Sequence, residues 1–420
     1  MFRLIIGILL TYQQIFSVDF IFFPIRTRTL MAVIGMYMLV RDWNSFRIPS
    51  GYSRILKNLL VAVGMIFSLA VVSSVINGVL DPYFFKFPIV LLISFASSYC
   101  FIKWLAYITG ERLTMELLIK YFVMACLLQC VLSLLVFLFP PFRSFIFAIV
   151  PMNEMNEYAV NFNIHPTEDV LFRMIPVGYD FWGNGTTVAV IIFLMALLIS
   201  FEKEQRKFFL QLLTLIFIIV IGASVSRTTL VGVPFFLLYM FMGNGERRNK
   251  RYILGMILMF IPIIILVYTW FLETYPIFES IFERAFSIIY IFKDTGDMQS
   301  VESMVGQSVI PTEFKTWLIG DGLMSDPLNP GTGFYKEVDI GVWRLVWGVG
   351  IFGLLLFSYI QYLYLRLARF DRLSVLCMFI IYCGFLYKGI FYYDLLMSPF
   401  IAMTLYRINY NNLETNESEE

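Results

Sequence analysis

The chain has 420 residues, of which 59% are hydrophobic, 18% aromatic and 15% charged, and its formal net charge is +1. A soluble domain carries about 25% charged residues, so this composition excludes a water-soluble core and indicates an all-α polytopic membrane protein. The near-zero net charge argues against a nucleic-acid partner. The five cysteines lie in apolar runs without the spacing of a metal site or of a secreted disulfide scaffold.

Apolar runs long enough for membrane helices recur along most of the chain. Because a helix needs about 20 residues to cross a bilayer, the runs predict about twelve transmembrane spans. The first run lacks a small-residue cleavage site and is interpreted as a retained span. The predicted spans lie at 3–24, 28–40, 57–79, 84–109, 115–139, 185–201, 208–225, 228–242, 252–271, 341–364, 373–389 and 391–407.

Basic residues in the short loops predict the orientation. Four short segments rich in Lys and Arg fall on one side of the twelve-span arrangement, at 41–57, 202–207, 243–251 and 366–372. By the positive-inside rule that side is the cytoplasm, which also places both termini there. Arg26 and Arg28 fall on the opposite side, in a predicted tight external hairpin, and are the one conflict with the rule.

Two long extracytoplasmic loops are predicted within a single integral membrane domain, residues 1–420. The first loop, 140–184, contains His165, the only histidine of the chain, and Arg173, which precedes the sixth span. The second loop, 272–340, repeats apolar residues at helical spacing over 276–293, which predicts an interfacial helix. That helix is either a lid on the outer ends of the spans or a contact for a lipid substrate. Loops of this length are usually functional.

The end of the second loop and the start of the next span form the most informative stretch. It carries a Gly-Asp-Gly turn at 320–322, then Glu337 and Asp339, and Arg344 near the start of a membrane helix. An arginine close to hydrocarbon costs about 2.5–3.5 kcal/mol at mid-depth and is therefore a site hypothesis by default. The G-x-G-x-x-G pattern at 348–353 lies inside an apolar span, so close helix packing explains it better than a dinucleotide site.

Three arginines are predicted at the outer ends of spans: Arg173, Arg344, and Arg227 in a second tight hairpin. A guanidinium is permanently charged and forked, which suits bidentate binding of phosphate oxygens. The alternative for each is a pairing with a neighbouring carboxylate that locks helix ends. Three at one depth beside an acidic, glycine-rich loop favour a pyrophosphate site.

Several of these segments resemble a known family. They are Ser-Arg-Thr-Thr-Leu-Val-Gly at 226–232, the turn at 320–322, and Asp339-Ile-Gly with Arg344 and Gly-Ile-Phe-Gly-Leu at 350–354. Their order resembles the Wzy polysaccharide polymerases and the related O-antigen ligases, over roughly residues 165–370. The first 160 residues resemble this family only in general hydropathy.

The resemblance implies a GT-C-like, metal-independent glycosyltransferase without a cofactor. It would act on undecaprenyl-pyrophosphate-linked glycan at the outer face of the bacterial cytoplasmic membrane, with a chain-length regulator as a further partner. Arg227 and Arg173 would hold the pyrophosphate. The ligases carry a histidine in the loop before the span at 341–364, and this chain has none after His165, which favours a polymerase. Asn184 is not preceded by the Asp-Pro usual in the family.

The chemistry of sugar transfer requires a base for the acceptor hydroxyl, and a carboxylate can supply it. Glu337 and Asp339 are the candidates, with Asp321 third. The alternative role for Asp339 is the N-cap of the following span. Two other functions stay open besides ligation: a lipid-linked oligosaccharide flippase or transporter, and a membrane scaffold. Ionisable groups in or near spans favour the transporter: Lys103, Lys120, Lys388 and Asp394.

Overall fold

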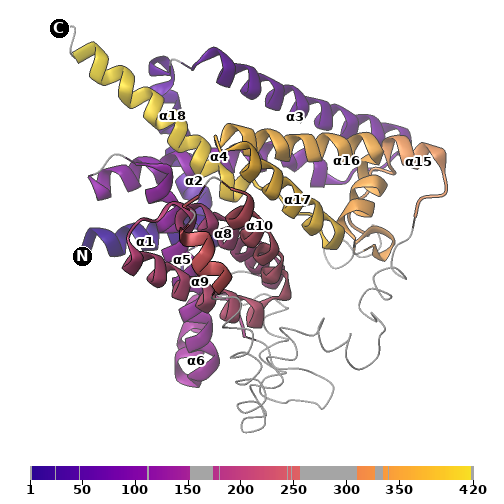
Figure 1. Ribbon diagram of the computed structural model, residues 1–420. Coiled ribbons are helices and arrows are strands. Elements are labelled where there is room, and N and C mark those ends of the chain that lie inside the picture. Colours follow the sequence, from indigo (N-terminus) through magenta and orange to yellow (C-terminus); the bar gives the residue numbers. More distant parts are fainter. Residues whose placement is uncertain are drawn as a thin grey trace, which may run out of the picture. The chain divides into compact units, whose positions relative to one another are not determined.

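The structure is a computed structural model (Figure 1). It describes residues 2–23, 25–46, 48–110, 113–151, 174–178, 180–243, 245–246, 248–255, 310–326, 334–338 and 340–417. These residues form helices and connections without a β-strand, and the one β-type bridge among them joins Ser325 to Phe334. The predicted interfacial helix at 276–293, Arg173, His165 and Asp339 all lie outside the described residues.

Six helices in the described part of the chain are long and apolar enough to cross a membrane. They are α3 (Ser50–Asn77), α4 (Pro82–Thr109), α5 (Met115–Leu138), α8 (Phe181–Phe201), α9 (Gln205–Val225) and α16 (Gly341–Leu367). The protein is therefore a multi-pass α-helical membrane protein, which confirms the fold class expected from composition. The full number of spans and the GT-C-like class stay predictions.

Five further helices in the described part of the chain occupy most of the other predicted spans, with different ends. They are α1 (Phe2–Phe16), α2 (Thr27–Asp42), α10 (Gly232–Met242), α17 (Arg372–Lys388) and α18 (Asp394–Glu417). The first helix ends well before residue 24 because Ser17 adopts a left-handed backbone, with φ of 46°. Residues 227–231 form a 3-10 helix, η2, ahead of α10. Hydropathy does not register such turns inside an apolar run.

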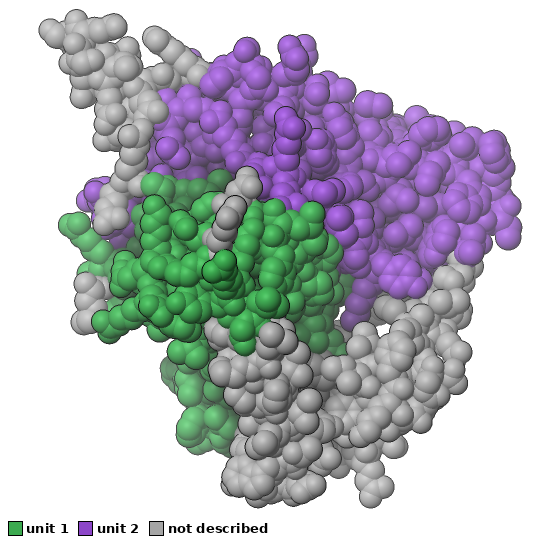
Figure 2. All heavy atoms as spheres, in the orientation of Figure 1, with its two compact units in different colours: residues 1–27, 114–298 green, residues 28–113, 299–420 purple. Residues whose placement is uncertain are grey.

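The helices gather into two compact units, drawn in green and purple in Figure 2. Unit 1 combines residues 1–27 with 114–298, and unit 2 combines 28–113 with 299–420. Each unit is therefore built from two separate stretches of chain, so its core forms from residues far apart in sequence.

Unit 1 is organised around α8. Nearly every side chain of this helix is buried, as expected for a helix that is apolar on all sides. Helix α5 packs on α1, α8 and α9, and α6 (Pro140–Ile149) packs on α5. The end of α9 meets the start of α8, where Gly185 lies against Ser226. Helix α10 packs on α8, and its first residue, Gly232, lies against the Ala189 backbone. Glycine is needed at such close approaches.

Unit 2 is built on the helix pair α3 and α4. Helix α16 packs along α3, α18 packs along α4, and the short helix α15 (Phe314–Ile319) contacts both α16 and α3. Asp81 caps α4, since its Oδ1 accepts from the Tyr83 N–H at 2.9 Å. Its Oδ2 accepts from the N–H groups of Met324 and Ser325 at 2.8 and 2.9 Å. One buried carboxylate thus fixes the loop after α15 to the turn between α3 and α4.

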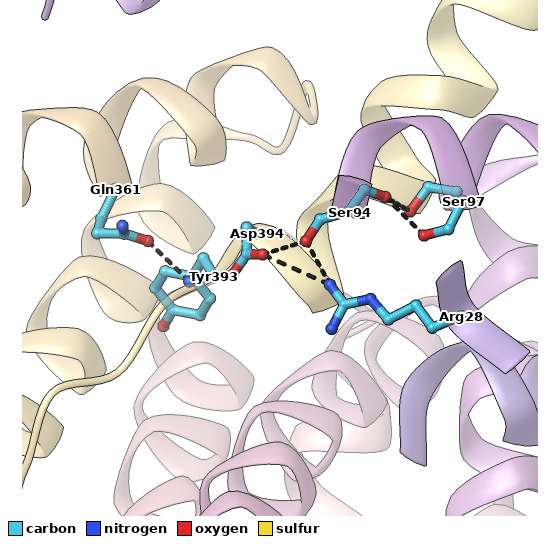
Figure 3. A network of polar contacts seen from close by, with 7 residues as sticks. Arg28, Ser94, Ser97, Gln361, Tyr393 and Asp394 are labelled. Atoms are coloured by element: carbon cyan, nitrogen blue, oxygen red, sulfur yellow. Dashed lines mark hydrogen bonds and ion pairs between the residues drawn. The ribbon is translucent and has the colours of Figure 1, made fainter. Parts of the chain in front are cut away.

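Arg28 lies inside unit 2 and not in an exposed hairpin (Figure 3). Its Nη2 is 3.6 Å from Asp394 Oδ2, and the Ser94 hydroxyl bridges the two groups. Ser94 is 12 residues into α4, about 18 Å from its start. The side chain of Arg28 is 22% exposed and that of Asp394 is 7% exposed. The expectation of an external loop charge is therefore wrong for Arg28. A paired internal charge does not report loop orientation, which removes half of the conflict with the positive-inside rule.

Candidate functional site

Two glycine-containing segments cross where α15 meets α16 in unit 2. Gly320 and Gly350 both have left-handed backbones, with φ of 75° and 70°. A Cβ on Gly350 would lie 2.2 Å from the Leu318 carbonyl oxygen, and one on Gly320 would lie 2.4 Å from the Gly348 carbonyl carbon. Only glycine allows both the conformation and the approach. The pattern at 348–353 thus lies at a close backbone crossing, in keeping with the packing interpretation.

The crossing interrupts α16 at Gly350, whose backbone is not helical. The carbonyl groups of Trp347 and Gly348 accept from the N–H groups of Asp321 and Gly322, at 2.6 and 3.0 Å. In a membrane, backbone groups released from a helix must be bonded within the protein. The loop after α15 meets that requirement, and it thereby holds Asp321 at a fixed position beside α16.

Helix α3 supports the same crossing with polar side chains near its end. The Ser73 hydroxyl lies 3.3 Å from the Gly320 carbonyl oxygen. The Asn77 amide donates to that oxygen at 3.1 Å, while its own Oδ1 accepts from Lys315 Nζ at 2.6 Å. Lys315 is exposed on α15, and it forms no ion pair with any residue that the structure describes. Its positive charge is therefore held in place by a neutral partner, the Asn77 amide.

The Asp321 carboxylate is held by two hydroxyl groups. Its Oδ1 accepts from Thr316 Oγ1 at 2.6 Å, and its Oδ2 accepts from the Tyr335 hydroxyl at 3.2 Å. Partial burial, and then the Asp321 carboxylate, raise the pKa of Tyr335 to about 12. Tyr335 therefore stays protonated at neutral pH and donates to Asp321. These two hydroxyl groups fix the position of the Asp321 carboxylate.

The segment before α16 carries a backbone that is unusual for its residue types. Lys336 and Glu337 are consecutive non-glycine residues with left-handed φ values of 54° and 57°. Such conformations cost about 1–3 kcal/mol each and persist where surrounding contacts hold them. Lys336 Nζ lies 3.8 Å from the centre of the Trp347 ring, a cation–π contact. The Glu337 side chain is exposed.

Arg344 lies one turn into α16, where the sequence predicted it, and is buried with 9% exposure. Its Nε donates to the Val338 carbonyl at 2.8 Å, and its guanidinium carbon lies 3.1 Å from the centre of the Phe334 ring. These contacts join α16 to both ends of the segment 334–338. The helix begins at Gly341 with Ile340 as N-cap, and the alternative role of Asp339 stays a prediction because that residue lies outside the described part of the chain.

In unit 1, Arg227 is exposed at the first position of η2, where α9 gives way to α10. A polar chain lies inside the same unit. Tyr12 donates to Gln129 Oε1 at 2.6 Å, and Gln129 Nε2 donates to Asn184 Oδ1 at 3.1 Å. Asn184, whose flanking sequence departs from the family pattern, is thus a buried link between α8 and α5. The proposed gathering of Arg227 with Arg173 and Arg344 stays a prediction.

The candidate site in unit 2 therefore contains Arg344, Glu337 and Asp321 from the sequence prediction, and several residues that the prediction missed. Tyr335 and Lys336 stand beside Glu337 in the chain and were accessible to sequence reasoning. Asp81 before Pro82 also fits a known helix-start pattern. The contact of Lys315 with Asn77 joins residues 238 positions apart and leaves no local signal.

Among the residues that the structure describes, no group of three or more His, Cys, Asp or Glu side chains is arranged to hold a metal ion. The comparisons with known proteins found no matching family model, no matching curated protein and no matching solved structure. The functional interpretation therefore depends on the motifs of the sequence and on the geometry of this site.

Proposed function

We propose that the protein is a glycosyltransferase that polymerises undecaprenyl-pyrophosphate-linked repeat units at the outer face of the bacterial cytoplasmic membrane. The observation that carries the proposal is the cluster at the crossing of α15 and α16. It combines the cations Lys315, Lys336 and Arg344 with the carboxylates Asp321 and Glu337. Anionic leaving groups need cations, and acceptor hydroxyls need a base.

In the proposed reaction, an acceptor hydroxyl oxygen attacks the anomeric carbon of the donor. The bond from that carbon to the pyrophosphate oxygen breaks, and the pyrophosphate keeps the electron pair. The hydroxyl proton passes to a carboxylate. Cations placed around the leaving group in a water-poor site stabilise the charge that develops there. Arg227 and Arg173 belong to this proposal as further pyrophosphate ligands.

Among the candidate bases, the geometry favours Glu337 over Asp321. Both oxygens of Asp321 accept from hydroxyl groups, which suits a positioning role. Glu337 is exposed on a segment whose backbone is held in a costly conformation. Asp339 stays a second candidate beside it.

The test of the base is Glu337→Gln in a purified assay with lipid-linked repeat units. Loss of a general base is expected to slow elongation by about 10²–10⁴-fold while leaving protein yield and thermal stability unchanged. Glu246→Gln, an exposed glutamate of a predicted cytoplasmic loop, is the matched control and is expected to elongate normally. Normal elongation by Glu337→Gln would remove this residue from the chemistry and leave Asp339→Asn as the next variant.

The transporter alternative has less support from the structure. Three of the four ionisable residues that favoured it form ion pairs: Lys103 with Asp42, Lys120 with Glu116, and Asp394 with Arg28. Paired charges suit helix packing better than a substrate path. The ligase alternative differs only in the acceptor, and transfer onto lipid A would identify it.

A further inference from the structure

An open groove of about 800 Å³ runs between α3 and α16. Both helices are candidate membrane spans, so we expect the groove between them to face hydrocarbon. Its walls are almost entirely apolar, and its floor on α3 includes two small residues one turn apart. The residues that matter here are Gly64, Ser68 and Val72 on α3 and Phe352, Leu355 and Tyr359 on α16.

The length of the groove matches one leaflet of a bilayer. It extends along α3 from Val61 to Val72, a distance of about 16 Å at 1.5 Å per residue. The hydrocarbon core of a bilayer is about 30 Å thick. A chain lying in the groove would therefore reach about half-way through the membrane, as the tail of a lipid from a single leaflet does.

One end of the groove, at Val72, lies near the candidate site along α3. Asn77 follows Val72 by five residues, about 8 Å along α3. It holds Lys315 Nζ at 2.6 Å and the Gly320 carbonyl at 3.1 Å. An exposed cation at this end complements an anionic headgroup, and the apolar walls beyond it complement a hydrocarbon tail.

We propose that the groove between α3 and α16 binds the isoprenoid chain of the lipid-linked donor, with its pyrophosphate beside Lys315. The identity of the lipid rests on the proposed function. The position of the groove is independent of that function. The gaps left by Gly64 and Ser68 between bulkier side chains suit a chain with methyl branches. Lys315 then acts as a binding residue for the headgroup.

Gly64 allows a clean test because a Cβ built on it meets no atom within 4 Å. Gly64→Leu therefore fills the groove without a clash in the protein. Gly384 on α17 is an equally open, exposed glycine away from the groove, so Gly384→Leu is the matched control. Both changes replace a poor helix former with a good one, so both variants are expected to fold.

The measurement is photolabelling in nanodiscs of phosphatidylethanolamine and phosphatidylglycerol. One probe is undecaprenyl pyrophosphate with a benzophenone on its chain, and the other is phosphatidylglycerol with the same group. The isoprenoid probe is expected to label peptides from 61–72 and 352–359 in the wild type and in Gly384→Leu. Filling occupied space should reduce that labelling about tenfold in Gly64→Leu.

Two results would overturn the inference. One is equal isoprenoid labelling of these peptides in Gly64→Leu and the wild type. The other is equal labelling by phosphatidylglycerol, which would make the groove a general lipid contact.

A third variant, Lys315→Ala, should weaken labelling by the pyrophosphate probe and leave labelling by the matching uncharged polyprenol unchanged. Labelling does not depend on turnover. If the isoprenoid probe labels the groove but the protein never elongates glycan, the proposed function is wrong and the inference about the groove stands.

Discussion

Two regions of unit 2 hold cationic side chains with different kinds of partner. Between α2, α4 and α18, Arg28 is matched by the carboxylate of Asp394, so the pair carries no net charge. At the crossing of α15 and α16, Lys315 and Lys336 contact an amide oxygen and aromatic rings. Neutral partners orient a cation without cancelling its charge. The first region therefore stabilises the helix bundle, and the second keeps positive charge available for an anionic ligand.

The largest effect is expected in the paired region. Arg28→Ala leaves Asp394 buried without its cation, which should destabilise the protein by about 3–5 kcal/mol. Thermal unfolding of purified protein in detergent measures the change. The double variant Arg28→Met with Asp394→Leu should recover most of the loss, because no single charge is left behind. Wild-type stability of Arg28→Ala would show that the pair does not hold the bundle.

The second effect concerns the backbone crossing. Gly350→Ala adds a Cβ where the Leu318 carbonyl oxygen lies and forces an L-residue into a left-handed backbone. A loss of about 1–3 kcal/mol is expected in thermal unfolding. Gly384→Ala in open space on α17 is the control and should be neutral or slightly stabilising. Similar stability of the two variants would mean that the crossing tolerates a side chain.

In the unpaired region the effect should fall on function and not on folding. Lys336→Ala removes a cation that no described carboxylate neutralises, so KM for the lipid-linked donor should rise about tenfold with little change in thermal stability. Lys336→Arg keeps both the charge and the contact with Trp347 and should retain most of the affinity. If Lys336→Ala unfolds early and binds donor normally, the lysine has a structural role like that of Arg28.

The smallest effect is expected at Tyr335. Tyr335→Phe removes one donor to Asp321 and should cost about 0.5–1.5 kcal/mol at neutral pH. The folded protein holds the Tyr335 proton up to about pH 12, against a usual pKa of 10.0. Stability should therefore fall as pH rises between these values in the wild type, and less so in Tyr335→Phe. Parallel slopes in the two proteins would contradict the raised pKa of Tyr335, and unchanged stability of Tyr335→Phe at neutral pH would contradict the contact with Asp321.

The sequence predicted what depends on local composition. Apolar runs located most helices, and the position of Arg344 at the start of a membrane helix was confirmed. Hydropathy did not place the turn after Phe16. It also did not show that Arg28 is partly buried, because its partner Asp394 is 366 positions away in the chain. It also did not show that Gly350 interrupts its helix, because that break depends on the segment 318–322 lying against it.

Under the proposed function, this protein elongates lipid-linked glycan without a metal ion. The direct measurement is an assay of the purified protein in nanodiscs with undecaprenyl-pyrophosphate-linked repeat units and excess EDTA, resolved by gel electrophoresis. The account predicts a ladder of products that lengthens with time, with no lipid A present. An absence of any ladder from folded protein, or product formed only when lipid A is added, would contradict it.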